Sequence, residues 1–479
     1  MNQHYDLVII GAGSGGLSAA ALARQLEARV ALVEGNRIGG DCTWTGCVPS
    51  KTLLKTARVA HQMRTAAQHG LVAARPEVDL KAVMGHVRDV IDEIAGEESP
   101  ETLQAQGIAV WHGEGRFLDP HTLAVGDATL TARRFLLTTG AHPFIAPIRG
   151  LQDVDYLTYE TLWDLEALPE RLLIVGGGPI GCEMAQAFRR LGAEVTVFAS
   201  GDRVLPRDDP AASEVLGTVF EREGIRVLFE ARVASVRRDP AGLHIEGGGQ
   251  SAVGDALLLA VGRRPTVAGL DLERAGVAYS ADGIQVNQNP QTSQRHIYAA
   301  GDCTGGPQFA HYAGWQASLA VRNALLPGAS RAVRDQVPWT TFTDPEVAHV
   351  GLTERDARER FGEGVMTFEW PMALVDRART DGDTSGFIKL VHQRDGRLLG
   401  ATVVARRAGD MIQEWTLAMR KKIKVGELSD VIHVYPTYSV AGQQAAAAIR
   451  VDRLMSGASG WLVRRLVSLT RRNADRRRR

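Results

Sequence analysis

Short apolar runs and stretches of small residues alternate along the first part of the chain. An apolar run at residues 5–10 (YDLVII) predicts a buried strand, and a second run at residues 30–34 predicts another. The segment 17–26 between them is rich in alanine and leucine and predicts a helix. This order of strand, helix and strand is typical of a parallel α/β unit.

A glycine pattern, Gly11-x-Gly13-x-x-Gly16, lies at the turn between the first strand and the helix. These glycines permit a tight turn, let backbone N–H groups approach a pyrophosphate at the helix N-terminus, and let the helix pack closely on the strand. Glu34 follows Gly16 by 18 residues and is placed to bind ribose hydroxyls. We therefore expect a dinucleotide site here.

The same arrangement recurs 165 residues later in the chain. An apolar run at residues 172–175 leads into Gly176-x-Gly178-x-x-Gly181, and a second strand is predicted at residues 194–198. One such glycine pattern is often a mere turn, but two copies in the same context favour nucleotide binding. The sequence therefore predicts two dinucleotide-binding folds.

The second fold lacks the acidic residue of the first. The matching position, 18 residues after Gly181, is Ala199, so no carboxylate is available for the ribose of NAD. Arg203 and Arg207 either meet the 2′-phosphate of NADPH or are solvated loop charges. We expect NADPH as the cofactor, with NADH as the alternative.

Composition fits an α/β protein of several domains. The chain has 479 residues, more than one hydrophobic core usually organises, and 44% of them are hydrophobic. Its 51 glycines suit many tight turns between strands and helices. We recognise no signal peptide and no apolar run near the roughly 18 residues that span a bilayer, so we expect a cytoplasmic protein.

The end of the chain differs from the rest in charge. The formal net charge is zero, but residues 461–479 hold eight arginines and one acid, Asp475. Four apolar residues of this segment recur at helical spacing, namely Trp461, Leu462, Leu466 and Leu469. Three interpretations stay open: a basic amphipathic helix peripheral to an anionic membrane, a solvated frayed end, and nucleic-acid contact, which is the least favoured.

The most specific segment is residues 39–51, GGDCTWTGCVPSK, which holds two of the four cysteines. In a regular helix the Cα atoms of Cys42 and Cys47 would be roughly 8 Å apart, too far for a disulfide. A bond between them needs distorted backbone, which Gly46 could supply. Such a disulfide is readily reduced, and a helix N-terminus would stabilise the resulting thiolate. Half a zinc site and two buried thiols are the alternatives, but no second Cys or His cluster accompanies the pair.

Residues 39–51 resemble the active-site segment of the class I pyridine nucleotide-disulfide oxidoreductases, a family that includes dihydrolipoyl dehydrogenase, glutathione reductase and mercuric reductase. The resemblance also covers TTGA at 138–141, AVGRRP at 260–265, AGD at 300–302 and FTDPEVA at 342–348. It implies an enzyme that uses FAD and NAD(P)H and acts as a homodimer, with Cys42 of one subunit and Tyr435 of the other in a shared active site.

The resemblance also implies a domain order. We expect an FAD-binding domain in residues 1–150 that resumes at 271–335, and an NAD(P)-binding domain at 151–270. A C-terminal α+β dimerisation domain would follow at 336–450, and a basic tail at 451–479. Both nucleotide-binding domains would be Rossmann-like α/β folds.

Roles for single residues follow from the same resemblance. Cys47 would lie nearest the flavin, and Cys42 would be the thiol that meets the substrate. Lys51 would lie near flavin N5, and Glu183 between nicotinamide and flavin, paired with Lys51. Further cofactor contacts would come from Thr139, Gly140, Gly262 and Asp302, the last at the flavin ribityl chain.

The chain departs from the disulfide-reducing members near its C-terminus. Those members carry His-x-His-Pro-Thr-x-x-Glu, whose second His protonates the leaving thiol. Here Tyr435 replaces that His, and Val440 replaces the Glu that holds it. A phenol, with an ordinary pKa of about 10, is a poor proton shuttle at neutral pH. His433 could substitute, although an ordinary loop histidine is the favoured interpretation.

Tyrosine at position 435 is a feature of mercuric reductase-like members, which the segment 298–304 (YAAGDCT) also resembles. Two thiolates can bind soft Hg(II), and a metal ion needs no leaving-group acid. Those members also end in a vicinal cysteine pair, whereas this chain has no cysteine after Cys303, and Trp44 stands where relatives often carry Asn. Cys182 is expected to pack as a small apolar side chain beside the second dinucleotide turn, and Cys303 to lie near the flavin without reacting.

We therefore predict an oxidoreductase that passes electrons from NADPH through FAD to the Cys42–Cys47 disulfide and on to a soft metal ion or a small electrophile. A dihydrolipoyl dehydrogenase-like activity that uses His433 is the first alternative. A redox sensor with a membrane-associating tail is the second, and two complete nucleotide sites count against it. No resident metal site is expected.

Overall fold

The computed structural model describes residues 3–477, with backbone alone for residues 3, 457, 458 and 472–477. The last two arginines of the predicted basic tail lie outside the described residues. The chain forms two compact units: residues 1–206 with 217–334, and residues 207–216 with 335–479. No helix within the described part of the chain is long and apolar enough to cross a membrane.

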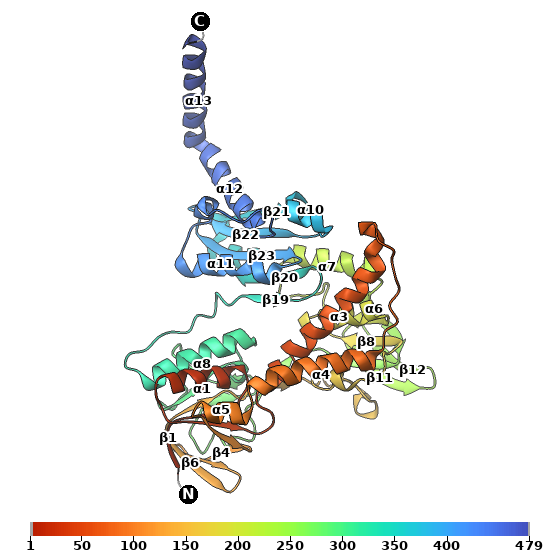
Figure 1. Cartoon of the computed structure of the whole chain (residues 1–479), viewed down its shortest axis with the longest axis vertical. Coiled ribbons are helices and arrows are strands. Elements are labelled where there is room, and N and C mark those ends of the chain that lie inside the picture. The colour runs from red at the N-terminus through yellow and green to blue at the C-terminus, as the bar shows by residue number, and fades with distance from the viewer. Residues whose placement is uncertain (1–2, 478–479) are drawn as a thin grey trace. The chain divides into compact units, whose positions relative to one another are not determined.

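A seven-stranded sheet organises the N-terminal part of the first unit, in the order β3-β2-β1-β6-β5-β4 with β18 also paired to β6. Its parallel strands are β1 (Gln3–Ile10), β2 (Val30–Glu34), β3 (Ala109–His112), β6 (Ala128–Leu137) and β18 (Ile297–Ala299). The antiparallel strands are β4 (Gly115–Asp119) and β5 (Thr122–Val125). Helices α1 (Ser14–Gln25) and α8 (Ala310–Leu325) lie side by side on one face and bury their alanines against it (Figure 1). The predicted strand–helix–strand opening is confirmed.

A second parallel sheet has the order β10-β9-β8-β14. Its strands are β8 (Arg171–Val175), β9 (Glu194–Phe198), β10 (Arg226–Leu228) and β14 (Ala256–Leu259). Helix α6 (Pro179–Leu191) connects β8 to β9, and α7 (Pro210–Glu223) precedes β10. An antiparallel meander packs against this sheet through a shared apolar cluster, with strands β11 (Val233–Asp239), β12 (Gly242–Gly247) and β13 (Gln250–Gly254). The chain therefore contains the two predicted Rossmann-like folds.

Four helices fill the connection from β2 to β3, namely α2 (Gly40–Trp44), α3 (Cys47–Thr65), α4 (Leu80–Glu97) and α5 (Pro100–Ala105). Two short ladders complete the first unit: β7 (Ala141–Pro143) with β15 (Arg263–Pro265), and β16 (Tyr279–Ser280) with β17 (Gly283–Ile284). The β7–β15 ladder joins the segments of two motifs that are distant in the sequence, since Arg263 pairs with Pro143 and Pro265 with Ala141.

The second unit is an antiparallel sheet covered by helices, as expected for an α+β domain. Its strand order is β19 (Trp339–Thr341), β20 (Glu346–Gly351), β23 (Leu398–Ala405), β22 (Phe387–Gln393) and β21 (Val365–Pro371). The helices are α9 (Glu354–Phe361), α10 (Asp376–Asp381), α11 (Ala408–Lys421), α12 (Val440–Met455) and α13 (Gly457–Arg477). Residues of the sheet, α11 and α12 share one core that contains the buried Trp415. The predicted boundary at residue 450 falls within α12, and the division into five segments stays a prediction.

Candidate redox and nucleotide sites

The first glycine turn combines close backbone contacts with one open position. A Cβ atom added at Gly11, whose φ is +101°, would lie 2.4 Å from the Thr138 carbonyl oxygen, and one at Gly16 would lie 1.9 Å from the Gly11 oxygen. At Gly13 the nearest atom would be 3.8 Å away. The turn therefore needs glycine at two positions for packing, and the open Gly13 leaves room for a pyrophosphate at the N-terminus of α1.

Glu34 ends β2 beside this turn. Its Oε2 accepts a hydrogen bond of 2.6 Å from the Ala12 N–H, and its Oε1 accepts one of 2.7 Å from the Asn36 N–H. Each carboxylate oxygen has a second lone pair, so the fixed carboxylate can still accept bonds from ribose hydroxyls. The first fold thus has the parts that a dinucleotide-binding fold requires.

The second glycine turn repeats the geometry. A Cβ added at Gly176 would lie 2.2 Å from the Ala260 oxygen, and one at Gly181 would lie 1.9 Å from the Gly176 oxygen, whereas Gly178 faces open space. In both turns the first and third glycines of the pattern are closely packed, and the middle glycine faces open space.

The two folds differ at the end of their second strand, where Glu34 ends β2 in the first fold and Ala199 follows β9 in the second. Ala199 lies against the second turn, since a Cβ added at Gly177 would be 3.1 Å from the Ala199 methyl group. No carboxylate occupies the place that Glu34 holds in the first fold. Arg203 is bonded locally to Asp202 and to the Pro206 carbonyl oxygen, each at 3.3 Å, and Arg207 belongs to the second unit.

The backbone between the two cysteines is distorted, as predicted. Helix α2 ends at Trp44 and α3 begins at Cys47, with Gly46 between them at φ −114° and ψ −103°. A Cβ at Gly46 would lie 2.8 Å from the Asp41 carbonyl oxygen, so the break is built around glycine. Cys47 is the first residue of α3 and so has the stabilising helix N-terminus that the sequence predicted.

The pKa values of the two cysteines are shifted in opposite directions. A hydrogen bond from the Cys42 thiol lowers the pKa of Cys47 to about 7, and the positive charges of Lys51 and Arg263 act in the same direction. The pKa of Cys42 is raised because its proton is held in that bond and because the side chain is half-buried. Cys47 is therefore the thiolate of the pair, and Cys42 keeps the proton.

Lys51 and Glu183 form the pair that the sequence predicted. Lys51 Nζ, one turn after Cys47 in α3, lies 2.9 Å from Glu183 Oε2 on α6, and Nζ also donates to Ser50 Oγ at 3.2 Å. The Glu183 side chain is only 7% exposed, so the ion pair is well shielded on that side. This contact connects the cysteine helix to the first helix of the second nucleotide fold.

The half-buried guanidinium of Arg263 links the cysteine loop to Asp302, and sequence reasoning missed this contact. Arg263 Nη2 pairs with Asp41, the residue before Cys42, while Nη1 lies 2.7 Å from Asp302 Oδ2. The Tyr159 hydroxyl joins the cluster, donating to Asp41 Oδ2 at 3.1 Å and accepting from Arg263 Nε at 3.2 Å. Burial raises the pKa of Asp302, and Arg263 opposes that rise. Asp41 and Arg263 lie within the motifs at residues 39–51 and 260–265, but neither was predicted to be a functional residue. Tyr159 lies in no recognised motif.

The remaining predicted cofactor residues surround the β7–β15 ladder. Thr139 Oγ1 donates to the Thr266 carbonyl oxygen at 2.7 Å, and the Thr266 N–H donates to the Gly140 carbonyl oxygen at 3.0 Å. Gly262 has a φ of +118° and faces open space. The structure thus brings the TTGA and GRRP segments together beside Asp302.

Two predicted residues of the second unit have local carboxylate partners. The Tyr435 hydroxyl donates to Asp376 Oδ2 at 3.0 Å, and this bond raises the pKa of the phenol. His433 Nε2 lies 2.9 Å from Glu414 Oε1, and Nδ1 lies 3.0 Å from the Val431 carbonyl oxygen. Sequence reasoning identified neither Asp376 nor Glu414, because both lie on other helices.

Cys182 packs beside the second dinucleotide turn as expected, whereas the expected place of Cys303 near a flavin stays a prediction. Cys182 is fully buried, with its thiol 3.4 Å from the Gly177 carbonyl oxygen at the second turn, and Cys303 is fully buried behind Asp302. The Trp44 indole donates to the Ile38 carbonyl oxygen at 2.7 Å, which makes this unusual residue a brace for the loop. Among the residues with described side chains, no three His, Cys, Asp or Glu gather to hold a metal ion.

Known sequence families match almost the whole of this architecture. Residues 5–317 match the pyridine nucleotide-disulphide oxidoreductase family, and residues 337–446 match the dimerisation domain of the same family. The chain belongs to the pyridine nucleotide-disulphide oxidoreductases. These enzymes depend on FAD and use a pyridine nucleotide, and the two glycine turns and Glu34 fit that requirement.

This oxidoreductase resembles relatives of two named activities. It is 37% identical to a mercuric reductase from Bacillus cereus over 91% of this chain and 70% of the relative. It is also 37% identical to a dihydrolipoyl dehydrogenase from Thermus scotoductus, over 93% of this chain and 97% of the relative. A solved structure, the Cu(II) complex of the HOCl-induced flavoprotein disulfide reductase RclA from Escherichia coli, superimposes with a TM-score of 0.84 at 28% identity, covering 94% of this chain and 100% of RclA.

Proposed function

We propose that this oxidoreductase transfers electrons from NADPH to a soft metal ion through Cys42 and Cys47, with Hg(II) as the model substrate. FAD, when bound, supplies the two-electron chemistry between the nicotinamide and the cysteine pair. The overall reaction converts NADPH and Hg(II) into NADP⁺, a proton and metallic mercury, so that two electrons leave the nucleotide and two reach the metal. The cysteine sulfurs bind the ion and are regenerated.

The observation that carries this proposal is the stabilised thiolate of Cys47. Because its pKa is lowered to about 7, a large fraction of Cys47 is ionised at neutral pH, and the thiolate is the form that binds soft metals. Cys42 lies within hydrogen-bond distance and provides the second sulfur once its proton is displaced. A loop that holds one thiolate and one adjacent thiol is suited to a two-coordinate soft ion.

The residues of the second unit support a metal ion rather than a disulfide as acceptor. A disulfide acceptor releases a thiolate that must be protonated, and general acids contribute roughly 10²- to 10⁴-fold to such steps. Tyr435 is a weaker acid than an ordinary phenol because it is bonded to the Asp376 carboxylate, so it is a poor proton donor. Reduction of a metal ion needs no such proton.

His433 does not offer the missing acid. Both of its ring nitrogens already lie within 3.0 Å of acceptors, the Glu414 carboxylate and the Val431 carbonyl, and its side chain is only 9% exposed. Such a histidine braces its loop to α11. The alternative activity on lipoamide would require it to leave both partners.

The relatives add independent support for a metal acceptor. Proteins similar to this chain include a mercuric reductase, and the structure of RclA was obtained as a Cu(II) complex. We propose the same class of acceptor for this chain because Cys47 is a stabilised thiolate and because Tyr435 is a poor general acid.

We also propose NADPH as the electron donor. Ala199 leaves the ribose of the second nucleotide without the carboxylate that Glu34 provides in the first fold. A carboxylate at this place favours the 2′-hydroxyl of NADH and repels the 2′-phosphate of NADPH. Its replacement by a methyl group removes both effects.

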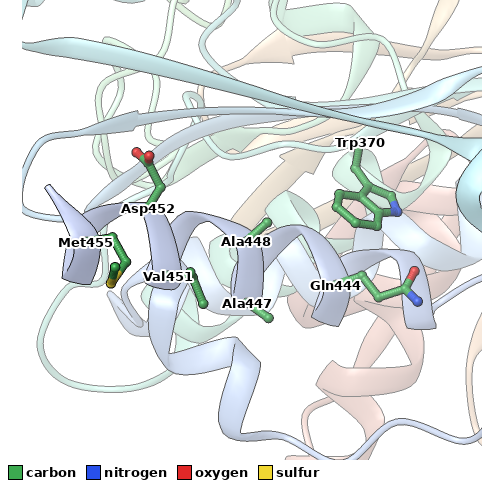
Figure 2. Close-up of a pocket in the computed structure, with 7 residues that line it drawn as sticks. All are labelled: Trp370, Gln444, Ala447, Ala448, Val451, Asp452 and Met455. Carbon is green, nitrogen blue, oxygen red and sulfur yellow. The ribbon is translucent and has the colours of Figure 1, made fainter. Parts of the chain in front are cut away.

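A homodimer is the assembly that we propose. The exposed side of α12 forms a shallow hollow with β21, lined by Trp370, Gln444, Ala447, Ala448, Val451, Asp452 and Met455 (Figure 2). Trp370 Nε1 and Gln444 Oε1 are buried there without a hydrogen-bond partner among the described residues. A second copy would cover this apolar surface and satisfy both groups.

The test is anaerobic NADPH oxidation by the FAD-loaded protein, with Hg(II), lipoamide, oxidised glutathione and a quinone offered separately. We expect turnover with Hg(II) that is lost in both Cys42→Ala and Cys47→Ala, while both variants retain bound FAD. Efficient lipoamide turnover would instead favour the dihydrolipoyl dehydrogenase-like alternative. No NADPH oxidation with any acceptor would favour a redox sensor.

A further inference from the structure

Helix α13 is a separate element at the end of the second unit. It spans Gly457–Arg477, leads away from α12 (Figure 1), and lies beyond residue 446, where the match to the dimerisation domain ends. A Cβ at Gly460 would lie 1.9 Å from the Met455 carbonyl oxygen, so the first turn of α13 is fitted to the end of α12. The basic segment is therefore a helix in this structure, rather than the frayed end that was one interpretation of the sequence.

One side of α13 is apolar and exposed. Leu462, Leu466, Val467 and Leu469 are each 48–54% exposed. With 3.6 residues per turn, these four side chains fall within an arc of roughly 160° around the helix axis. Soluble proteins normally cover such an apolar face with another surface.

The opposite side of α13 is basic. Arg464, Arg465 and Arg471 project from it, and residues 457–471 contain no acidic residue. The Arg465 guanidinium lies 4.9 Å from the centre of the Trp461 ring, so Trp461 belongs with the arginines and not with the leucines, contrary to the grouping expected from spacing alone. An indole beside arginines at the edge of an apolar face is an arrangement suited to the boundary between lipid headgroups and acyl chains.

The chemistry of the two faces points to one kind of partner. A coiled coil with a second α13 needs apolar heptads sustained over about three or four repeats, whereas this apolar arc ends after residue 469. Two such helices would also bring like charges together. Nucleic acid would meet the arginines but leave the leucines exposed. We propose that α13 lies in the surface of an anionic lipid bilayer, with its leucines at the acyl boundary and its arginines among the phosphates.

The proposal is independent of which acceptor the cysteines reduce. A peripheral helix of this kind binds reversibly, since it neither spans the bilayer nor carries a covalent lipid. The predicted cytoplasmic location would place it beside the anionic inner leaflet. The enzyme would then act close to a membrane surface.

The test is co-sedimentation of the full-length, FAD-loaded protein with vesicles of phosphatidylcholine alone or mixed with phosphatidylglycerol. We expect binding to the mixed vesicles only, weakened by salt. Each arginine should contribute about fivefold to the partition coefficient, so Arg464→Gln with Arg465→Gln should weaken binding about 25-fold. Leu462→Ser with Leu466→Ser should abolish it.

The matched control is Arg355→Gln, which removes a highly exposed arginine from α9 and should leave binding unchanged. Retained FAD absorbance and unchanged melting temperature would exclude misfolding of the α13 variants. Equal binding to both vesicle types, or binding that survives the leucine substitutions, would overturn the proposal. Loss of dimers rather than of lipid binding in the leucine variants would assign α13 to self-association, and a shift of duplex DNA without vesicle binding would assign it to nucleic acid.

Discussion

Arg263 Nη1 lies 2.7 Å from Asp302 Oδ2, and the same guanidinium pairs with Asp41, the residue before Cys42. One half-buried cation thus joins the cysteine loop to the turn that carries Asp302, the predicted flavin contact. Its charge also favours the Cys47 thiolate. Arg263 therefore contacts Asp41 and Asp302 and also lowers the pKa of Cys47.

The effect of Arg263 on Cys47 can be measured without turnover. In Arg263→Met the pKa of Cys47 should rise by about one unit, because a nearby opposite charge is lost. The rate of alkylation of the reduced protein by iodoacetamide, followed against pH, reports this pKa. Arg263→Lys should restore most of the shift, and Arg264→Met, which changes the exposed neighbour stacked on Phe144, should show none. An unchanged alkylation profile in Arg263→Met would show that Arg263 does not lower the pKa of Cys47.

Ala199→Glu should change the nucleotide preference. A carboxylate beside Gly177 would accept bonds from the 2′-hydroxyl of NADH and repel the 2′-phosphate of NADPH, so the kcat/KM ratio should move toward NADH by about tenfold or more. Ala199→Gln separates charge from size and should move the ratio less. A wild-type preference for NADH, or an unaltered ratio in Ala199→Glu, would contradict the assignment of this position.

Restoring the missing acid should create a disulfide reductase. Tyr435→His with Val440→Glu reproduces the acid and its holder, and lipoamide turnover should rise about 100-fold over the wild type. Tyr435→His alone should gain less, because nothing would orient the imidazole. Steady-state NADH and NADPH oxidation with lipoamide checks this, and an already efficient wild type would refute the role given to Tyr435.

Asp208 should make stability depend on pH. Burial raises the pKa of this carboxyl to about 6, although Trp339 Nε1 donates to it at 2.8 Å. A carboxyl whose pKa is raised in the folded state binds more protons there, so stability falls as pH increases from about 4 to about 6. Asp208→Asn should therefore be more stable than the wild type above pH 6, by roughly 3 kcal/mol at most, with the difference vanishing near pH 4. Urea unfolding at both pH values measures this, and the exposed Asp202→Asn is the control.

Local patterns predicted the two nucleotide folds well. The strand at residues 194–198 and the turn at Gly176–Gly181 arise from apolar runs and glycines that act over a few residues, so their signal is contained in the sequence. The break at Gly46 was predictable for the same reason, because a disulfide between residues five positions apart cannot form in a regular helix.

Long-range contacts were beyond such patterns. Asp41 and Arg263 are separated by 222 residues, and Tyr159 lies 118 residues from Asp41. Nothing in the periodicity of either segment specifies the other, because the contact is created when the β7–β15 ladder brings distant motifs together. Asp376 and Glu414, the carboxylate partners of Tyr435 and His433, could not be predicted for the same reason.

The separation of Asp41 from Arg263 has a consequence for biosynthesis. Cys42 and Cys47 leave the ribosome long before Arg263 is translated, and Glu183 also comes later than its partner Lys51. The nascent chain therefore exposes its cysteines without the guanidinium that later favours the Cys47 thiolate. The charge arrangement that lowers the pKa of Cys47 is therefore complete only after residue 263 has been synthesised and the chain has folded.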